Sequence, residues 1–302
     1  MLAVTILGNN SAIPAFNRHP TAQIVHTPEQ NFLVDCGEGT QSQLSKYKIK
    51  YSKINHIFIS HLHGDHYFGL IGLLTSMGLL GRKHELHIYA TGALQTIIEL
   101  QLKVAAAILP YEIHFHALMQ EEIILEDKKI EVKCFKVKHR IECWGFLFTE
   151  KKHPRKIIIE EVKKYNIPTD FYERLHMGED YVDENNATIK NELLTSAVSP
   201  PKNYAYCADT IYDEDLVEKI KNTDLIYHET TYLQELAHLS TQRGHSTTLQ
   251  AAAFAKKVNC KKLIVGHYSS RYDNITVFEE ECKTIFQNTV AAYDGLKIVL
   301  DF

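Results

Sequence analysis

The 302-residue chain lacks several features that would assign it to a specialised class of protein. It contains no unbroken apolar run of about 18 residues, the length that a membrane-spanning helix needs. Its start, MLAVTILGNNSAIP, has neither the basic segment nor the cleavage-like site of a secretory signal. We therefore expect no membrane association and a cytoplasmic location.

Cysteine is sparse: six residues are scattered along the chain, without a C-x-x-C pair or a dense spacing. This distribution argues against a disulfide framework and favours reduced, buried thiols. A formal net charge of -4 argues against a generic nucleic-acid coat. Positive charge is nevertheless concentrated locally, because residues 128–164 contain twelve Lys and Arg against five Asp and Glu.

What the chain does have is enough apolar residues, 45%, for one large domain or two modest ones. Short apolar runs typical of β-strands recur throughout, joined early by turns such as TPEQ (27–30) and later by helix-like stretches. This order predicts a layered α/β fold with mixed sheets. The predicted helices span 40–47, 92–104, 213–221, 246–258 and 276–292, and the last two have the expected N-caps Ser246 and Thr276.

One segment, 151–194, interrupts this pattern because it is highly charged and rich in turns. Two interpretations remain open from composition alone. It is an ordinary surface insertion, or it is a protruding arm that contacts a partner.

The stretch SHLHGDHYFGL (60–70) places three histidines and an aspartate within six residues, directly after the apolar run INHIFI. Other candidate ligands also follow strand-like runs, and carboxyl ends of strands form the ligand crevice of open α/β sheets. These candidates are His139, Asp209, His228 and His267.

The local spacing supports a metal site. In an extended segment His61 and His63 point to the same side, and a turn at Gly64 redirects Asp65 and His66 to a neighbouring point. Imidazoles with carboxylates suit Zn²⁺ or Mn²⁺, and two ions bridged by a carboxylate activate water for in-line attack. By contrast, isolated histidines are expected to be surface or hydrogen-bonded core residues; examples are His26, His56, His87 and His114.

The H-x-H-x-D-H pattern resembles the signature of the metallo-β-lactamase superfamily. Within it, the order of motifs is similar to that of ribonuclease Z, from about residue 6 to 272. These motifs are FLVDCGEGTQSQL, SHLHGDH, CADT, HETTY, GHST and VGHYSSRY. The resemblance implies an αβ/βα four-layer sandwich of two mixed β-sheets flanked by helices. The chain would be a single domain, 1–302, with residues 151–194 inserted as a flexible tRNA-binding arm.

The resemblance also implies two zinc ions per subunit, with Mn²⁺ as the alternative. The ligands of the first ion would be His61, His63 and His139; those of the second Asp65, His66 and His267; Asp209 would bridge both. Asp65 would in addition accept a proton from the attacking water. His245 would donate one to the leaving 3′ oxygen, with Glu229 as its orienting carboxylate.

The implied reaction is removal of 3′ trailers from precursor tRNA. Metal-bound hydroxide would attack the phosphorus after the discriminator nucleotide, leaving a tRNA 3′ hydroxyl and a 5′ phosphate on the trailer. The subunits are expected to form a homodimer. Predicted substrate contacts are Arg18, Thr210, Lys151, Lys152, Arg155 and Lys156. The alternative is another dinuclear hydrolase of this fold, a phosphodiesterase or thioesterase that acts on a small molecule.

The chain departs from the family pattern at two positions of interest. The loop PAFNRH (14–19) keeps the proline and Arg18 but has Phe16 and His19 where the family carries lysine and asparagine. Ile211 stands where arginine is common.

Overall fold

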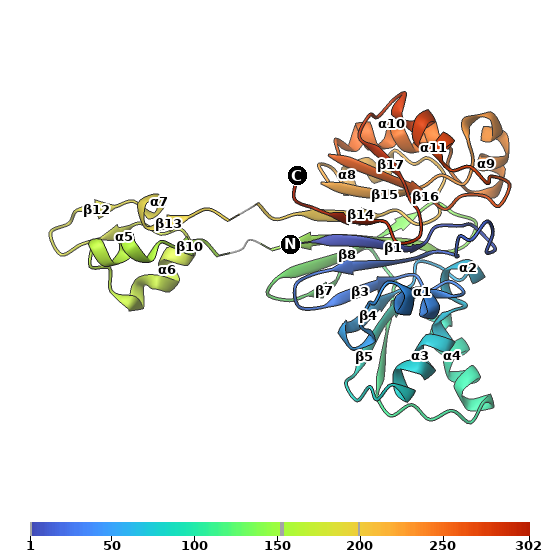
Figure 1. Ribbon diagram of the computed structural model, residues 1–302, viewed down its shortest axis with the longest axis horizontal. Coiled ribbons are helices and arrows are strands. Elements are labelled where there is room, and N and C mark those ends of the chain that lie inside the picture. Colours follow the sequence, from blue (N-terminus) through green and yellow to red (C-terminus); the bar gives the residue numbers. More distant parts are fainter. Residues whose placement is uncertain (1, 152–153, 199) are drawn as a thin grey trace. The chain divides into compact units, whose positions relative to one another are not determined.

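The computed structural model describes residues 2–151, 154–198 and 200–302 (Figure 1). Its internal contacts divide the chain into two compact units. The first comprises Met1–Glu126, Val132–Thr149 and Lys202–Phe302, and the second comprises Asp127–Glu131 and Glu150–Pro201.

The first unit contains two seven-stranded mixed sheets. One has the order β18-β1-β2-β3-β4-β5-β6; it is antiparallel from β18 to β3 and parallel from β3 to β6. The TPEQ stretch is the predicted turn between antiparallel β2 and β3. The strands are β1 (Ala3–Gly8), β2 (Ala22–His26), β3 (Asn31–Val34), β4 (Ile54–Phe58), β5 (Leu86–Ala90), β6 (Ile113–Ala117) and β18 (Lys297–Val299).

The second sheet has the order β17-β16-β15-β14-β9-β8-β7, with β14 to β17 parallel and β9 antiparallel to β14. Aromatic side chains join the two sheets: the rings of Phe58 and Phe146 lie 5.3 Å apart, and those of Phe32 and Phe148 lie 5.7 Å apart. The strands are β7 (Ile123–Glu126), β8 (Ile130–Val137), β9 (Cys143–Glu150), β14 (Asn203–Tyr206), β15 (Leu225–Glu229), β16 (Lys262–Gly266) and β17 (Thr289–Ala291).

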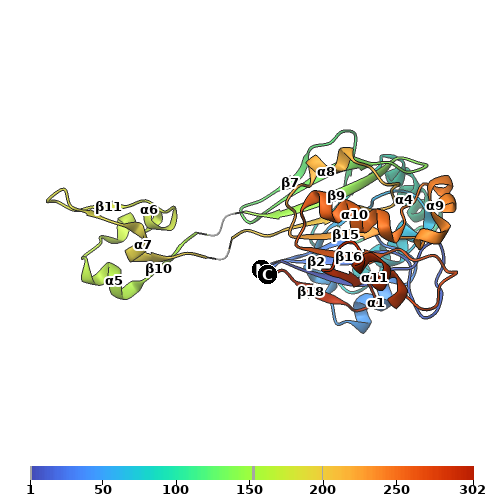
Figure 2. The same ribbon diagram turned by 90° about the horizontal axis from the view of Figure 1, so that it is seen from above.

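Helices cover the outer face of each sheet (Figures 1 and 2), which confirms the predicted four-layer arrangement. On the first sheet they are α1 (Thr40–Lys46), α3 (Leu70–Leu79) and α4 (Ala93–Val104); on the second, α8 (Asp215–Lys219), α10 (Thr248–Val258) and α11 (Thr276–Lys283). Short helices α2 (Gly64–Tyr67) and α9 (Ala237–Arg243) lie in loops. None of the helices in the described residues combines the length and apolarity needed to cross a membrane.

Two helix predictions were wrong in detail. The helix expected over 276–292 ends at Lys283, because Thr289–Ala291 pairs with β16 as the parallel strand β17. The N-cap of α10 is Thr247, not Ser246: the Thr247 hydroxyl accepts from Gln250 N in a capping box. The Ser246 hydroxyl instead donates to the carbonyl oxygen of Thr210. At α11 the expected cap Thr276 is the first helical residue and follows Ile275.

The second unit has a small apolar core of its own, formed by Val162, Ile167, Phe171, Leu175 and Leu194. Around this core lie short elements: β10 (Lys156–Ile157), α5 (Ile159–Lys164), α6 (Tyr172–His176), β11 (Tyr181–Val182), β12 (Thr188–Ile189), α7 (Asn191–Leu194) and β13 (Thr195–Ser196). The segment that interrupted the sequence pattern is therefore a folded unit, in which β10 pairs with β13.

Candidate metal centre

The candidate ligands converge because the strands that precede them end at one edge of the two sheets. His61 and His63 lie in the loop between β4 and α2, and Asp65 and His66 lie within α2. The others follow separate strands: His139 comes after β8, Asp209 after β14 and His267 after β16. All seven residues contribute to groups whose donor atoms lie within 4.8 Å of one another.

The first group combines three imidazoles with one carboxylate oxygen. His63 Nδ1 lies 3.0 Å from His61 Nε2 and 3.2 Å from His139 Nε2. Asp209 Oδ2 lies 3.7 Å from His61 Nε2 and 4.0 Å from His139 Nε2. Four ligands held at 2.0–2.1 Å from a tetrahedral ion are about 3.3 Å apart, so these separations fit a shared ion.

The second group shares Asp209 with the first but uses its other oxygen. His267 Nε2 lies 3.2 Å from Asp209 Oδ1, 3.3 Å from Asp65 Oδ2 and 3.3 Å from His66 Nε2. His66 Nε2 lies 3.6 Å from Asp65 Oδ2 and 3.5 Å from Asp209 Oδ1. These separations also fit the ligands of one ion.

Asp209 supplies the clearest test of whether metal fits. Its Oδ1 is buried and accepts no hydrogen bond from the residues that the structure describes, although two imidazole nitrogens lie beside it. A buried carboxylate oxygen without a hydrogen bond is costly, and a cation is the partner that such a donor set suits. Burial lowers the pKa of His61 and of His63, so both are neutral imidazoles able to bind an ion.

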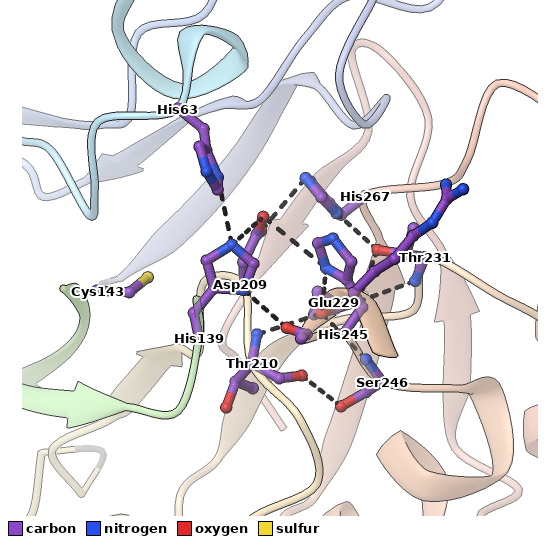
Figure 3. Close-up of polar contacts among 12 residues, drawn as sticks. His63, His139, Cys143, Asp209, Thr210, Glu229, Thr231, His245, Ser246 and His267 are labelled. Carbon is purple, nitrogen blue, oxygen red and sulfur yellow. Dashed lines mark hydrogen bonds and ion pairs between the residues drawn. The ribbon is translucent and has the colours of Figure 1, made fainter. Parts of the chain in front are cut away.

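Outer partners hold the remaining ring nitrogens of the imidazoles and so fix their orientation (Figure 3). His139 Nδ1 lies 2.7 Å from the carbonyl oxygen of Gly244, and His267 Nδ1 lies 2.9 Å from the Thr231 hydroxyl. His61 Nδ1 contacts the Ser60 hydroxyl at 3.0 Å. These contacts turn the ligating nitrogens towards Asp209.

Asp35 is a functional residue that the sequence analysis missed. It is fully buried, and its Oδ1 accepts from Ser60 N at 2.7 Å. Its Oδ2 receives the Ser60 hydroxyl at 2.9 Å, the Tyr206 hydroxyl at 2.6 Å and His66 Nδ1 at 2.8 Å. The available signal was its place directly after β3, like that of the ligands after their own strands.

Asp35 also affects the charge of its partner. Burial acts against a charge on His66, but the carboxylates of Asp209, Asp65 and Asp35 outweigh it and raise the pKa of that imidazole. An ion that binds His66 Nε2 therefore displaces a proton.

His245 and Glu229 form a buried pair beside the first group (Figure 3). His245 Nδ1 lies 2.8 Å from Glu229 Oε1 and 3.9 Å from Asp209 Oδ2. Glu229 also accepts from Thr231 N, Thr231 Oγ1 and Ser246 N, which fix the carboxylate. Burial opposes a charge on His245, but Glu229 outweighs it and raises the pKa of the imidazole, so His245 is suited to donating a proton.

Three residues singled out in the sequence lie in structural surroundings. His228 is buried, contacts the Glu229 carbonyl oxygen at 2.7 Å and packs against Phe254, outside the ligand groups. Arg18 is 8% exposed and donates to Asn10 Oδ1 and to two backbone carbonyls. Thr210 is fully buried and its hydroxyl donates to a carbonyl oxygen. This burial favours structural roles for Arg18 and Thr210 over substrate contacts.

The predicted arm contacts belong to the second unit. Arg155 donates to the Thr195 hydroxyl, Lys156 is exposed in β10, and Lys151 N donates to the Lys129 carbonyl. Lys152 lies outside the described residues.

Comparisons with known proteins agree with this centre. Residues 2–291 match a family model described as Anti-Pycsar protein Apyc1. The chain is 40% identical over 297 residues to ribonuclease Z of Bacteroides fragilis (strain YCH46), covering 98% of both chains, and 36% identical over 300 residues to that of Porphyromonas gingivalis (strain W83), covering 99% of both. Among solved structures, the short form of human tRNase Z has a TM-score of 0.73 at 24% identity, and the metallo-β-lactamase fold protein YhfI from Bacillus subtilis has 0.69 at 20%; each comparison covers 99% of this chain and 100% of the other.

Proposed function

The chain belongs to the ribonuclease Z family and has the metallo-β-lactamase fold, and from this premise we propose that it is a dinuclear zinc endonuclease. It removes the 3′ trailer from precursor tRNA. We place the cut after the discriminator nucleotide, leaving a 3′ hydroxyl on the tRNA and a 5′ phosphate on the trailer.

The observation that carries the proposal is the division of Asp209 between the two ligand groups. Its Oδ2 faces His61 and His139, and its Oδ1 faces His66 and His267. A carboxylate in this position holds two ions close together. Two bound ions lower the pKa of water and stabilise the charge that develops on phosphate oxygens. The N/O donor sets at tetrahedral spacing favour Zn²⁺, with Mn²⁺ as the alternative.

The residues of the chain have distinct roles in this proposal. Asp65 Oδ2 lies in the second group and also accepts the Ala12 N–H at 2.7 Å, so its orientation is fixed for taking a proton from the attacking water. His245 donates a proton to the leaving 3′ oxygen. Glu229 positions the His245 ring and favours its charged form.

We assign tRNA binding to the basic part of the second unit, which we take as the arm predicted over 151–194. Residues 151–164 contain six Lys and Arg against two Asp and Glu, whereas residues 165–194 contain two against seven. The exposed side chains of Lys156 and Lys163 suit sequence-independent contacts with phosphates. Lys164, in contrast, is paired with Glu161 at 3.1 Å.

A homodimer is part of the proposal. Large apolar side chains are exposed at the carboxyl-terminal ends of α3 and α4: Leu79, Leu80, Leu100 and Val104. Such exposure is typical of an interaction surface. Light scattering of the Leu79→Glu/Val104→Glu variant is expected to show monomers where the unaltered chain shows dimers. The six cysteines are free and buried, in keeping with a cytoplasmic location.

The second candidate function is hydrolysis of a small phosphodiester or thioester, which the match to the Apyc1 family model favours. One experiment separates the two. Purified protein is incubated with a 3′-extended tRNA transcript and with bis(p-nitrophenyl) phosphate, each with and without a chelator. Chelator-sensitive cleavage of the transcript at a single position is expected; an untouched transcript alongside hydrolysed small ester would reject the endonuclease.

A further inference from the structure

Histidines that looked isolated in the sequence gather on one face of the first sheet. His56 of β4, His87 of β5 and His114 of β6 are direct register partners across three parallel strands. Their rings stack at 5.0 Å and 5.1 Å, close to the spacing of neighbouring strands. We call these three residues the histidine ladder.

The histidine ladder lies at the amino-terminal ends of its strands. The metal centre lies beyond their carboxyl-terminal ends, and the five residues from His56 to His61 correspond to roughly 16 Å of extended chain. A cavity of about 730 Å³ opens beside the ladder, lined by Ser52, Asn55, His56, Lys83, His84, Glu85, His87 and Glu112. The ladder is therefore accessible at a place separate from the metal centre.

Two glutamates complete a set of metal-binding side chains at this place. The Glu85 carboxylate reaches both outer rings: Oε1 lies 3.5 Å from His87 Nε2, and Oε2 lies 3.3 Å from His114 Nε2. Glu112 Oε2 lies 3.8 Å from His114 Nε2.

The metal centre of the same chain provides a scale for these distances. Its imidazole and carboxylate donors are separated by 3.2 Å to 4.0 Å. The separations of 3.3, 3.5 and 3.8 Å at the ladder fall within that interval, with the same types of donor. They also bracket the value of about 3.3 Å expected for ligands of one tetrahedral ion.

We propose that Glu85, His87 and His114, joined by Glu112 or by water, bind a third divalent transition-metal ion of the Zn²⁺ class. The ion would link β5 to the edge strand β6 through one ligand from each. Neutral imidazoles with carboxylates are the ligands that suit Zn²⁺, Ni²⁺ and Cu²⁺. This site is independent of the proposed endonuclease function.

The third site is expected to be weaker than the metal centre. The side chains of Glu85 and Glu112 are 63% and 75% exposed, so binding must order them, and the two stacked rings must tilt towards each other. Lys83 lines the same cavity and repels a cation. The expected ion therefore exchanges with solvent, whereas the ions of the centre remain bound through a desalting column.

Equilibrium dialysis against micromolar Zn²⁺, followed by metal analysis, tests the proposal on the full-length protein. The unaltered chain is expected to bind one more Zn²⁺ than the His87→Gln/His114→Gln variant. His84→Gln, which changes a histidine of the same cavity that is not a proposed ligand, is expected to keep the full number. All three proteins should cleave precursor tRNA at the same rate, since the metal centre is unaltered.

Equal zinc content in the unaltered chain and the double variant would overturn the proposal, whatever the cleavage activity. Glu85→Gln provides a second test that leaves both imidazoles in place at an exposed position. It is expected to weaken binding of the third ion at least tenfold, and unchanged affinity would likewise reject Glu85 as a ligand. Melting curves recorded with chelator establish that each variant is folded.

Discussion

Replacing Asp35 with asparagine should remove a ligand from the second ion without touching that ligand. The Ser60 N–H cannot rotate, so the asparagine must keep its oxygen there and turn its NH₂ group towards the other three donors. The hydroxyls of Ser60 and Tyr206 adapt by rotation. His66 does not: its Nδ1 must give up its proton, which moves the hydrogen to Nε2, the atom that faces the ion.

The expected magnitude follows from these contacts. Loss of an outer partner of a metal-bound histidine lowers metal affinity by about 10- to 100-fold, equivalent to about 1.4 to 2.7 kcal/mol. The metal-free protein should also lose about 2 to 4 kcal/mol of unfolding free energy, because a buried carboxylate that accepts four hydrogen bonds is replaced. Chelator competition measures the affinity of each ion, and urea unfolding in chelator measures the stability.

Asp294 provides a matched control in the same unit. Its side chain is 8% exposed and accepts from Asn9 Nδ2, His19 N, His19 Nδ1 and Gln43 Nε2. Asp294→Asn also disturbs a bond to an imidazole, but it touches no ligand of the centre. It should cost stability and leave metal affinity unchanged. If Asp35→Asn binds both ions as tightly as the unaltered chain, the proposed control of the His66 tautomer is refuted.

Three further predictions concern catalysis, RNA binding and pH. Asp65→Ala should abolish cleavage of precursor tRNA with little loss of binding in a filter assay, and His245→Asn should lower kcat about 10²- to 10⁴-fold at nearly unchanged KM; equal loss of binding in either variant would contradict these roles. Lys156→Glu/Lys163→Glu should raise KM for tRNA and flatten its salt dependence while hydrolysis of bis(p-nitrophenyl) phosphate stays constant, and a parallel loss of both activities would count against an RNA-binding arm. Burial lowers the pKa of His228, so below about pH 6.5 the unfolded chain gains a proton that the native chain does not, and stability falls with pH by at most about 1.4 kcal/mol per unit. The His228→Gln variant should lose less stability than the unaltered chain between pH 7.5 and 5.5 in urea unfolding, and identical losses would exclude His228 as a source of the acid sensitivity.

The sequence by itself determined the layers of the fold and the ligands of the centre. Alternating apolar strands and helices specify the four-layer sandwich, because each element must bury its apolar face. H-x-H-x-D-H places four ligands through local backbone geometry alone. The remaining three stand directly after strands, and strand ends meet at one edge of a sheet.

Tertiary structure alone decided which residues support those ligands and which histidines meet elsewhere. Asp35 and His66 are 31 residues apart, and only the pairing of β3 with β4 brings the carboxylate to the ring. The strand β17 within a predicted helix has the same cause, since pairing with β16 outweighs local helical preference.

The histidine ladder shows the limit most clearly. His56, His87 and His114 are separated by long connections, and each is unremarkable in its own segment of sequence. They stack because β4, β5 and β6 are adjacent, parallel and in this register. A shift of one residue in the pairing would turn a ring to the opposite face of the sheet, so local sequence cannot specify the cluster and the packed sheet does.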